Sequence, residues 1–314
     1  MLIEKVHNGI YSQFRIPGIV VTEMGTLLAY YECRESNSDW ARIDIKIIRS
    51  TDEGATWQTV ALIKGEGNTL NNPVMFVKGD TLHFLFFKNY RILFHCISTD
   101  DGKTLSEPQE KHFDCAFFYN VAAVGPGHGI VHNGRMIVPI WFAQNEMVPS
   151  AHHPSIISTL YSDDGCQWYL GELIGKETLV NPSECALAVT ADNKVIISIR
   201  NENSCHQRAF ALSDNGFSNW QALHFDPKMP DPICMGSMCY ENGTLYHINC
   251  ESDTIRENLT VKISNDCFEN FVRVFVDTPG GYSDIAVKDS NLYILYERDY
   301  KNGGLYFQKI TSPM

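Results

Sequence analysis

The chain has 314 residues, of which 44% are hydrophobic and 20% charged, values that are ordinary for a folded globular protein and argue against disorder. Its 37 acidic residues outnumber its 25 basic ones, and the net charge of −12 leaves no basic surplus for binding a nucleic-acid phosphate backbone. The first ten residues carry Glu4 and Lys5 and predict no signal peptide. No stretch reaches the roughly 18 apolar residues of a membrane-spanning helix. We therefore expect neither a nucleic acid nor a membrane span.

A turn motif of the form S-x-D-x-G-x-T-W recurs along the chain. Residues 50–57 carry it in full, and residues 98–105 carry it with Leu in place of Trp. A third copy is placed at 161–168, with Tyr161 in the Ser position and Asp163, Gly165 and Trp168 kept. The copy at 213–220 has Asn215 in place of Asp, and the copy at 264–271 lacks the Gly. The spacing is about 50 residues, which is typical of a repeat fold.

Each copy lies between runs with the pattern of β-strands. Residues 43–49 (IDIKIIR) precede the first copy and residues 59–64 (TVALIK) follow it, which predicts a hairpin with Asp and Gly in its turn. Further strand-like runs occur at 194–199 and 292–296, and no amphipathic helix of 12 or more residues is evident. An all-β chain with a four-strand unit about every 50 residues is a β-propeller. We expect one domain over residues 1–314, a six-bladed β-propeller of four-stranded antiparallel blades, in which the turn motifs are structural.

Cysteine and histidine patterns give no metal site. The ten cysteines are spread along the chain without a CxxC pair, so reduced and mostly buried thiols are favoured over a disulfide framework or a zinc site. His152 and His153 are adjacent, and neighbours on a strand point to opposite faces, which argues against shared ligation. We expect no metal and no cofactor. The absent signal and the many cysteines favour a cytoplasmic location, with a secreted or periplasmic one left open for a chain whose signal has been removed.

Three arginines stand at comparable edges of separate predicted blades. Arg15 lies in F-R-I-P, Arg200 ends the run 194–199, and Arg256 precedes the strand-like residues 259–264. Taken singly, each is most simply a surface ion-pair partner. Together they could converge on one anion, and the planar fork of arginine suits a carboxylate.

The order of these motifs resembles the sialidase (neuraminidase) family from Arg15 to Glu297. F-R-I-P at 14–17 is followed by the Asp-box turns, by G-Y-S-D at 281–284 and by Tyr296-Glu297. The resemblance implies that Arg15, Arg200 and Arg256 clamp the carboxylate of a sialic acid. By the same resemblance, the other site residues have the following roles: Arg34, a further substrate contact; Asp39, the general acid; Tyr282, the nucleophile; Glu184, the partner of the nucleophile; and Glu297, the acid that fixes Arg15. Asp44 lies within a strand pattern and is expected to be structural, and His128 in the loop 125–130 is given no role.

This set of residues has a chemical logic of its own. The anomeric carbon of a sialic acid bears a carboxylate, which would repel an attacking Asp or Glu. A tyrosine hydroxyl is neutral until it attacks, but its pKa near 10 makes it a poor nucleophile unless a base such as Glu184 accepts its proton. Asp39 can protonate the departing oxygen and then activate water. We expect a retaining exo-α-sialidase that hydrolyses terminal sialic acid from glycans or oligosaccharides through a tyrosyl-glycoside intermediate.

Three other functions remain open on the sequence. The same arginines would serve a hydrolase of a related 2-keto acid sugar, deaminated or octulosonic, because they recognise only the carboxylate. Transfer to a sugar acceptor in place of water is a second alternative, and a carbohydrate-binding propeller without turnover is the third. No motif indicates the linkage preference or the oligomeric state.

Overall fold

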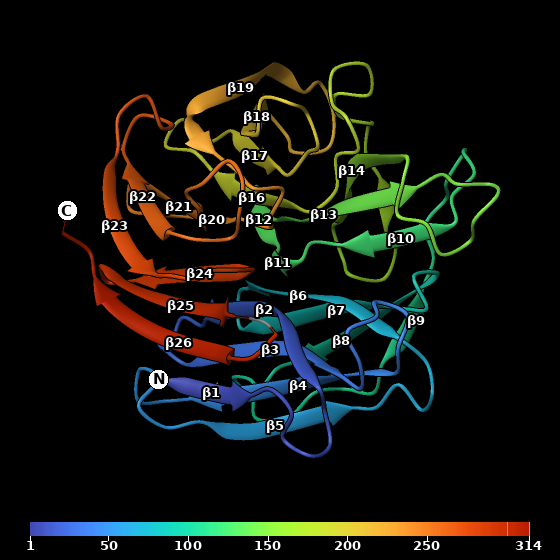
Figure 1. Cartoon of the computed structure of the whole chain (residues 1–314), viewed down its shortest axis with the longest axis vertical. Helices are drawn as coiled ribbons and strands as arrows, with labels where there is room; N and C mark the ends of the chain where they lie inside the picture. The colour runs from blue at the N-terminus through green and yellow to red at the C-terminus, as the bar shows by residue number, and fades with distance from the viewer. Residues whose placement is uncertain (300, 314) are drawn as a thin grey trace.

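Six β-sheets surround one centre in the computed structural model, which describes residues 1–299 and 301–313 (Figure 1). The described residues form 26 strands and no helix, and hence no helix long and apolar enough to cross a membrane. Each sheet contains a blade of four antiparallel strands, and two of the sheets carry one short additional strand. The expected all-β, six-bladed propeller is therefore confirmed.

The blades are numbered in chain order, with the innermost strand first. Blade 1 consists of β2 (Gln13–Val21), β3 (Leu27–Arg34), β4 (Ile43–Ser50) and β5 (Gln58–Ile63). Blade 2 consists of β6 (Leu70–Lys78), β7 (Thr81–Lys88), β8 (Ile92–Ser98) and β9 (Gln109–Lys111). Blade 3 consists of β10 (Val121–Val124), β13 (Arg135–Ala143), β14 (Ser155–Ser162) and β15 (Tyr169–Leu170). Blade 4 consists of β16 (Cys185–Val189), β17 (Val195–Ile199), β18 (Gln207–Ser213) and β19 (Gln221–Pro230). Blade 5 consists of β20 (Ser237–Glu241), β21 (Thr244–Cys250), β22 (Leu259–Ser264) and β23 (Val272–Asp277). Blade 6 consists of β24 (Ser283–Lys288), β25 (Asn291–Arg298), β26 (Gly304–Thr311) and β1 (Leu2–Lys5). Two short strands join this frame: β11 (Gly127–His128) beside β6, and β12 (Ile130–His132) beside β13.

The N-terminal strand β1 closes the ring. It pairs antiparallel with β26 as the outermost strand of blade 6, with Lys5 opposite Gly304. The third and fourth strands of this blade therefore come from opposite ends of the chain, and no hairpin turn joins them. This explains why six blades carry only five Asp-box turns.

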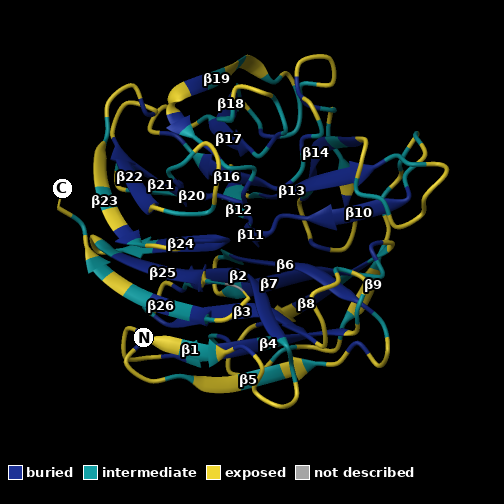
Figure 2. Cartoon of the chain, viewed as in Figure 1, coloured by how far each residue is buried: buried dark blue, intermediate teal, exposed yellow. Residues whose placement is uncertain are grey.

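Burial follows the position of a strand within its blade (Figure 2). All eight residues of β3 are buried, whereas the outer strand β5 has only exposed and half-buried residues. Inner strands pack against neighbouring blades on both faces and so carry apolar residues on both. For example, Tyr31 of blade 1 and Leu295 of blade 6 belong to one hydrophobic cluster.

The Asp-box turns are held by their own side chains and also join adjacent blades. In the first, Ser50 Oγ accepts a hydrogen bond from Gly54 N at 2.9 Å and Asp52 Oδ1 accepts one from Thr56 N at 2.9 Å. Hydrogen bonds from Thr56 lower the pKa of Asp52 to about 2. Gly54 has φ 87°. A Cβ on this glycine would lie 2.2 Å from the Phe307 ring of blade 6. The glycine therefore allows both the turn and the close approach of the neighbouring blade.

The structure explains the departures of the third and fifth Asp-box copies. The alignment of the third copy, at 161–168, was wrong by one residue. Ser162, and not Tyr161, occupies the Ser position, because its Oγ accepts from Gly165 N at 2.9 Å. Asp164 takes the Asp position, accepting from Cys166 N at 2.8 Å, while Asp163 pairs with Arg135. The turn has one residue fewer than the first copy between Ser and Gly.

The fifth copy replaces its glycine with Phe268. Phe268 N donates to Ser264 Oγ at 2.9 Å, and its φ is 69°. The buried ring lies 5.9 Å from that of Phe210 in blade 4. The side chain thus fills the space between blades that the other turns leave to a neighbouring residue.

Candidate active site

The predicted site residues meet at the end of the ring opposite the Asp-box turns. In an antiparallel blade, the start of the first strand and the end of the second share one end, whereas the turn between the third and fourth strands lies at the other. Seven of the eight predicted residues line one cavity of about 210 Å³: Arg15, Arg34, Asp39, Glu184, Arg200, Arg256 and Tyr282. The eighth, Glu297, lies directly behind Arg15. The structure therefore brings together residues from blades 1, 4, 5 and 6.

A buried carboxylate holds Arg15. Glu297, at the end of β25, accepts from Arg15 Nε at 3.0 Å and Nη2 at 3.2 Å, and from Ile16 N at 3.1 Å. A bulge in β2 between Arg15 and Gly18, at Ile16-Pro17, shifts the register with β3. Burial opposes the charge of Arg15, but Glu297 outweighs it and raises the pKa of Arg15 above its ordinary value. The guanidinium is thus fixed and charged.

Tyr282 and Glu184 form a hydrogen-bonded pair. The Tyr282 hydroxyl donates to Glu184 Oε1 at 2.8 Å and accepts from Arg200 Nη1 at 2.5 Å. Arg200 Nη1 also donates to Glu184 Oε2. Both Glu184 and Tyr282 directly precede the innermost strand of their blade, β16 and β24, while Arg200 directly follows β17. The pKa of Tyr282 lies above its ordinary value, chiefly because the side chain is buried. Glu184 raises this pKa further, whereas Arg200, Arg256 and Arg15 act to lower it.

Three arginines surround the ring of Tyr282. The guanidinium carbons of Arg15, Arg256 and Arg200 lie 4.9, 5.1 and 5.9 Å from the ring centroid. Arg256 Nη2 also donates to the carbonyl of Ile233 at 3.4 Å. Cation–π contacts hold all three guanidinium groups beside the tyrosine, and ion pairs further hold Arg15 and Arg200, so the cluster can receive an anion there.

Arg34 joins the candidate acid Asp39 to the strand below. Its Nη1 lies 2.6 Å from Asp39 Oδ1 and its Nε 2.7 Å from Glu32 Oε2. Burial raises the pKa of Asp39, but Arg34 outweighs this effect and the net pKa lies below the usual value. The Asp39 side chain keeps 43% of its exposure, so a ligand or water can reach it.

Sequence reasoning missed several residues that line this cavity, and it missed Glu32, which does not line the cavity but binds Arg34. Glu32 is fully buried, and burial raises its pKa although Arg34 acts to lower it. Its place two residues before Arg34 on a strand puts both on one face, which was the available signal. Asn72, Tyr90, Trp141 and Ser183 do line the cavity, and they carried no motif.

The two adjacent histidines lie in the loop before β14 and not on a strand, and both line the cavity. The argument from opposite strand faces was therefore wrong. His152 packs 5.4 Å from each of the Tyr90 and Trp141 rings, and burial lowers its pKa. Among residues 1–299 and 301–313, no three His, Cys, Asp or Glu side chains are grouped to hold a metal ion.

Asp44 and His128 lie outside this cavity. Asp44 accepts from the Tyr11 hydroxyl at 2.7 Å and from Gly65 N at 2.9 Å, in agreement with a structural role. His128 Nδ1 lies 2.8 Å from Asp284 Oδ1, and its Nε2 lies 3.1 Å from the carbonyl of Met238. These contacts join β11 to blades 5 and 6.

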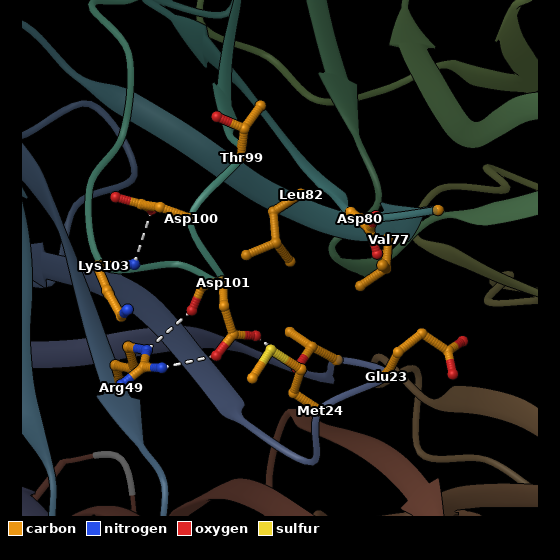
Figure 3. Close-up of a pocket in the computed structure, with 12 residues that line it drawn as sticks. Glu23, Met24, Arg49, Val77, Asp80, Leu82, Thr99, Asp100, Asp101 and Lys103 are labelled. Atoms are coloured by element: carbon orange, nitrogen blue, oxygen red, sulfur yellow. Dashed lines mark hydrogen bonds and ion pairs between the residues drawn. The ribbon is translucent and has the colours of Figure 1, made fainter.

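A second cavity, of about 540 Å³, lies between blades 1 and 2 at the Asp-box end (Figure 3). Two of its charged residues bind one another: Arg49 Nη2 lies 2.6 Å from Asp101 Oδ2, and Arg49 Nε donates to the Asp101 carbonyl at 2.8 Å. Asp101 also accepts from Thr22 and Thr26. None of the predicted site residues lines it, and the contacts hold the two blades together.

A six-bladed propeller with Asp-box turns and an arginine cluster around a tyrosine–glutamate pair places the protein in the class of sialidase-like propellers. Residues 58–294 match the family described as the BNR repeat-like domain. The chain belongs to that family, and the resemblance to sialidases with Asp-box repeats is confirmed.

Relatives and solved structures agree with this assignment. A sialidase of Bacteroides fragilis is 26% identical over 90% of this chain, which spans 60% of that protein's length. An exo-alpha-sialidase of Arthroderma benhamiae is 27% identical over 95% of this chain and 81% of its own length. The solved Hadza microbial sialidase Hz136 has a TM-score of 0.84 at 22% identity, over 97% of this chain and 66% of that one.

Proposed function

We propose that the protein is a retaining exo-α-sialidase, a glycoside hydrolase that removes terminal α-linked sialic acid from glycans or oligosaccharides. The observation that carries this proposal is the Tyr282 hydroxyl, held between Glu184 Oε1 and Arg200 Nη1 beside two further arginines. The sialidase names of the relatives support the substrate class.

Substrate binding begins with the carboxylate on the anomeric carbon. Arg15, Arg200 and Arg256 receive it by charge-assisted hydrogen bonds, which hold the anomeric carbon near the Tyr282 oxygen. The cavity of about 210 Å³ fits a single sugar ring better than an internal stretch of a chain, which supports cleavage at a terminus.

In the first chemical step the Tyr282 oxygen attacks the anomeric carbon and its proton passes to Glu184. The bond to the leaving oxygen breaks at the same time, and that oxygen takes a proton from Asp39. The products are the tyrosyl-glycoside and the free aglycone. A buried tyrosine is a weak acid, so transfer to a hydrogen-bonded base during attack avoids a free phenolate.

In the second step Asp39, now a carboxylate, removes a proton from water. The water attacks the anomeric carbon, the bond to Tyr282 breaks, and Glu184 returns its proton to the phenolate oxygen. Two displacements at the same carbon restore its original configuration, so the first sugar released is the α-anomer.

Release of fluorescence from 4-methylumbelliferyl α-sialoside tests this function. We expect turnover by the wild type and a loss of at least about a thousandfold in Tyr282→Phe, which keeps the ring and removes the nucleophilic oxygen. Tyr296→Phe is the matched control, because its hydroxyl binds Asp277 at 2.8 Å outside the cavity. No turnover by the wild type would contradict sialidase activity. Undiminished turnover by Tyr282→Phe would contradict the mechanism alone.

A further inference from the structure

The candidate acid Asp39 lies on the exposed loop 35–42, between β3 and β4. Six of the eight loop residues are exposed, and Asp39 and Ala41 are half-buried. Within the loop, Trp40 N donates to Ser38 Oγ at 3.1 Å and Ala41 N to the Ser38 carbonyl at 3.2 Å. General acid catalysis requires the acid to stay within hydrogen-bond reach of the leaving oxygen. Arg34 holds the Asp39 carboxylate itself, and the exposed backbone of the loop needs a further anchor beyond its own turn.

Trp40, the residue after Asp39, connects this loop to two other blades. Its indole Nε1 donates to the carbonyl of Ser150, 110 positions along the chain, at 3.2 Å. Its ring lies 4.9 Å from the ring of Tyr90 and 6.3 Å from that of His152. Tyr90 belongs to the β7–β8 turn of blade 2, whereas Ser150 and His152 belong to the β13–β14 loop of blade 3. One side chain thus joins three blades next to the acid.

The surface that receives Trp40 is itself fixed. The buried Asn120 amide donates to the carbonyls of Pro149 at 3.1 Å and Ala151 at 2.8 Å, on both sides of Ser150. Tyr90 is 2% exposed, and its backbone is bonded to Asn71 Oδ1 at 3.2 Å and to Ala122 N at 2.9 Å. The contacts of Trp40 therefore attach the exposed loop to well-held segments of blades 2 and 3.

We propose that Trp40 is a positioning residue for Asp39, which holds the acid at the leaving-group oxygen of the bound glycoside. This inference rests on the proposed function. As the bond from the anomeric carbon to the leaving oxygen breaks, its electron pair goes to that oxygen, and the proton comes from the Asp39 carboxyl. An alkoxide is a poor leaving group and needs this proton early, whereas an acidic phenol departs without much help. A displaced acid therefore slows the cleavage of sugar glycosides selectively.

The experiment compares two substrates and two tryptophan variants. Trp40→Phe keeps an aromatic ring and removes the Nε1 donor. Trp57→Phe is the matched control, because it removes an indole hydrogen bond of the same kind, to the Gly54 carbonyl at 3.1 Å, at the Asp-box end. Values of kcat/KM are measured on 3′-sialyllactose, with a sugar leaving group, and on 4-methylumbelliferyl α-sialoside, with an acidic phenol.

For Trp40→Phe we expect a loss of about tenfold or more on sialyllactose and of less than about threefold on the umbelliferyl substrate. Trp40→Ala, which also loses the ring contacts, should widen this difference, while Trp57→Phe should leave the ratio of the two values at that of the wild type. Thermal unfolding of each variant reports whether it is folded.

Two results would overturn the positioning role while leaving the proposed function intact. One is an equal loss on both substrates in folded Trp40→Phe, which indicates a binding or folding role. The other is no loss on either substrate. If the wild type hydrolyses neither substrate, the proposed function fails and the role of Trp40 falls with it.

Discussion

At the residue scale, the site concentrates positive charge in a molecule whose net charge is −12. Arg15 is paired with Glu297, Arg34 with Glu32 and Asp39, and Arg200 with Glu184. Each partner fixes a guanidinium that would otherwise lose side-chain entropy on binding a ligand. The local field in the cavity, and not the sum over the chain, decides whether an anionic sugar binds.

Arg34 also sets the protonation of the candidate acid. Its guanidinium lowers the pKa of Asp39 against the effect of burial, so Asp39 is largely ionised at neutral pH in the empty site. An acid must be protonated to act, and the alkaline limb of kcat/KM reports its pKa in the free enzyme. Neutralising the arginine removes the lowering effect, so the pKa of Asp39 rises and the alkaline limb moves to higher pH.

We therefore predict that Arg34→Gln moves the alkaline limb of the pH profile upward while the maximum of kcat/KM falls by roughly ten- to a hundredfold, the range for losing a charge-assisted contact. A pH series with the umbelliferyl sialoside measures both. Arg42→Gln is the control, because Arg42 pairs with Asp44 outside the cavity. An alkaline limb that stays in place or moves to lower pH in Arg34→Gln would show that Asp39 is not the titrating acid.

At the element scale, the Asp-box turns act as joints between blades as well as hairpin turns. Gly54 lies against Phe307 of blade 6, Gly102 against Leu28 of blade 1, and Gly165 against His95 of blade 2. Each glycine thus leaves room for a side chain of the preceding blade in the ring. These contacts hold neighbouring blades together at the end of the ring opposite the cavity.

The substitution Gly54→Ala tests this joint. A Cβ at this position meets the Phe307 ring at 2.2 Å, and the backbone has φ 87°. We expect a loss of about 1 kcal/mol from the left-handed backbone and a further ~1–3 kcal/mol from the clash, measured as the free energy of unfolding in denaturant. The kcat of the folded fraction should not change, because the turn lies at the opposite end of the blade.

Gly243→Ala separates the two contributions. Gly243 has φ 90°, but a Cβ there would meet no atom within 4 Å, so only the backbone term remains. Equal losses of stability in the two variants would mean that the contact with Phe307 does not matter. A larger loss in Gly54→Ala supports a joint between blades 1 and 6.

Most of the fold could be predicted from these turns, because the motif contains its own contacts. Ser50, Asp52 and Gly54 bond within eight residues, so their pattern is local. The third copy was misaligned because a one-residue deletion leaves a second Asp beside the first, and only hydrogen bonds distinguish Asp163 from Asp164. Phe268 could not be expected at a glycine position, because one of the rings it contacts, that of Phe210, lies in the neighbouring blade.

The candidate site was predictable to the extent that a residue belongs to a recognisable motif. Arg15 and Tyr282 lie in F-R-I-P and G-Y-S-D, and the structure places them in one cavity. Trp40 and His152 lie in no motif, and their roles depend on contacts across more than a hundred positions. Such contacts follow from how the blades close into a ring, which no local pattern records.

At the scale of the whole molecule, stability depends on polar groups enclosed between blades. His83 of blade 2 stacks on Phe76, and its Nδ1 lies 3.0 Å from His95 Nε2. His95 Nδ1 in turn lies 3.1 Å from the Gly165 carbonyl of blade 3. A carbonyl can only accept, so His95 carries its proton on Nδ1 and accepts from His83 through Nε2. This relay joins two blades while both rings are neutral.

Protonation of the relay should weaken the folded state in mild acid. Burial lowers the pKa of His83 and of His95 to about 4, whereas an unfolded histidine titrates near 6.5. Between these values the unfolded chain binds more protons than the folded one, so stability is fully present above about pH 6.5 and falls as the pH approaches 4. The loss is up to about 3 kcal/mol for each ring, and denaturant unfolding at a series of pH values measures it.

Two variants test whether these histidines cause the change of unfolding free energy with pH. His95→Gln, whose amide can still donate to Gly165, should lose roughly half of this slope. His112→Gln, at a side chain that is 84% exposed, should keep all of it. A slope in His95→Gln equal to that of the wild type would mean that acid lability arises elsewhere in the molecule.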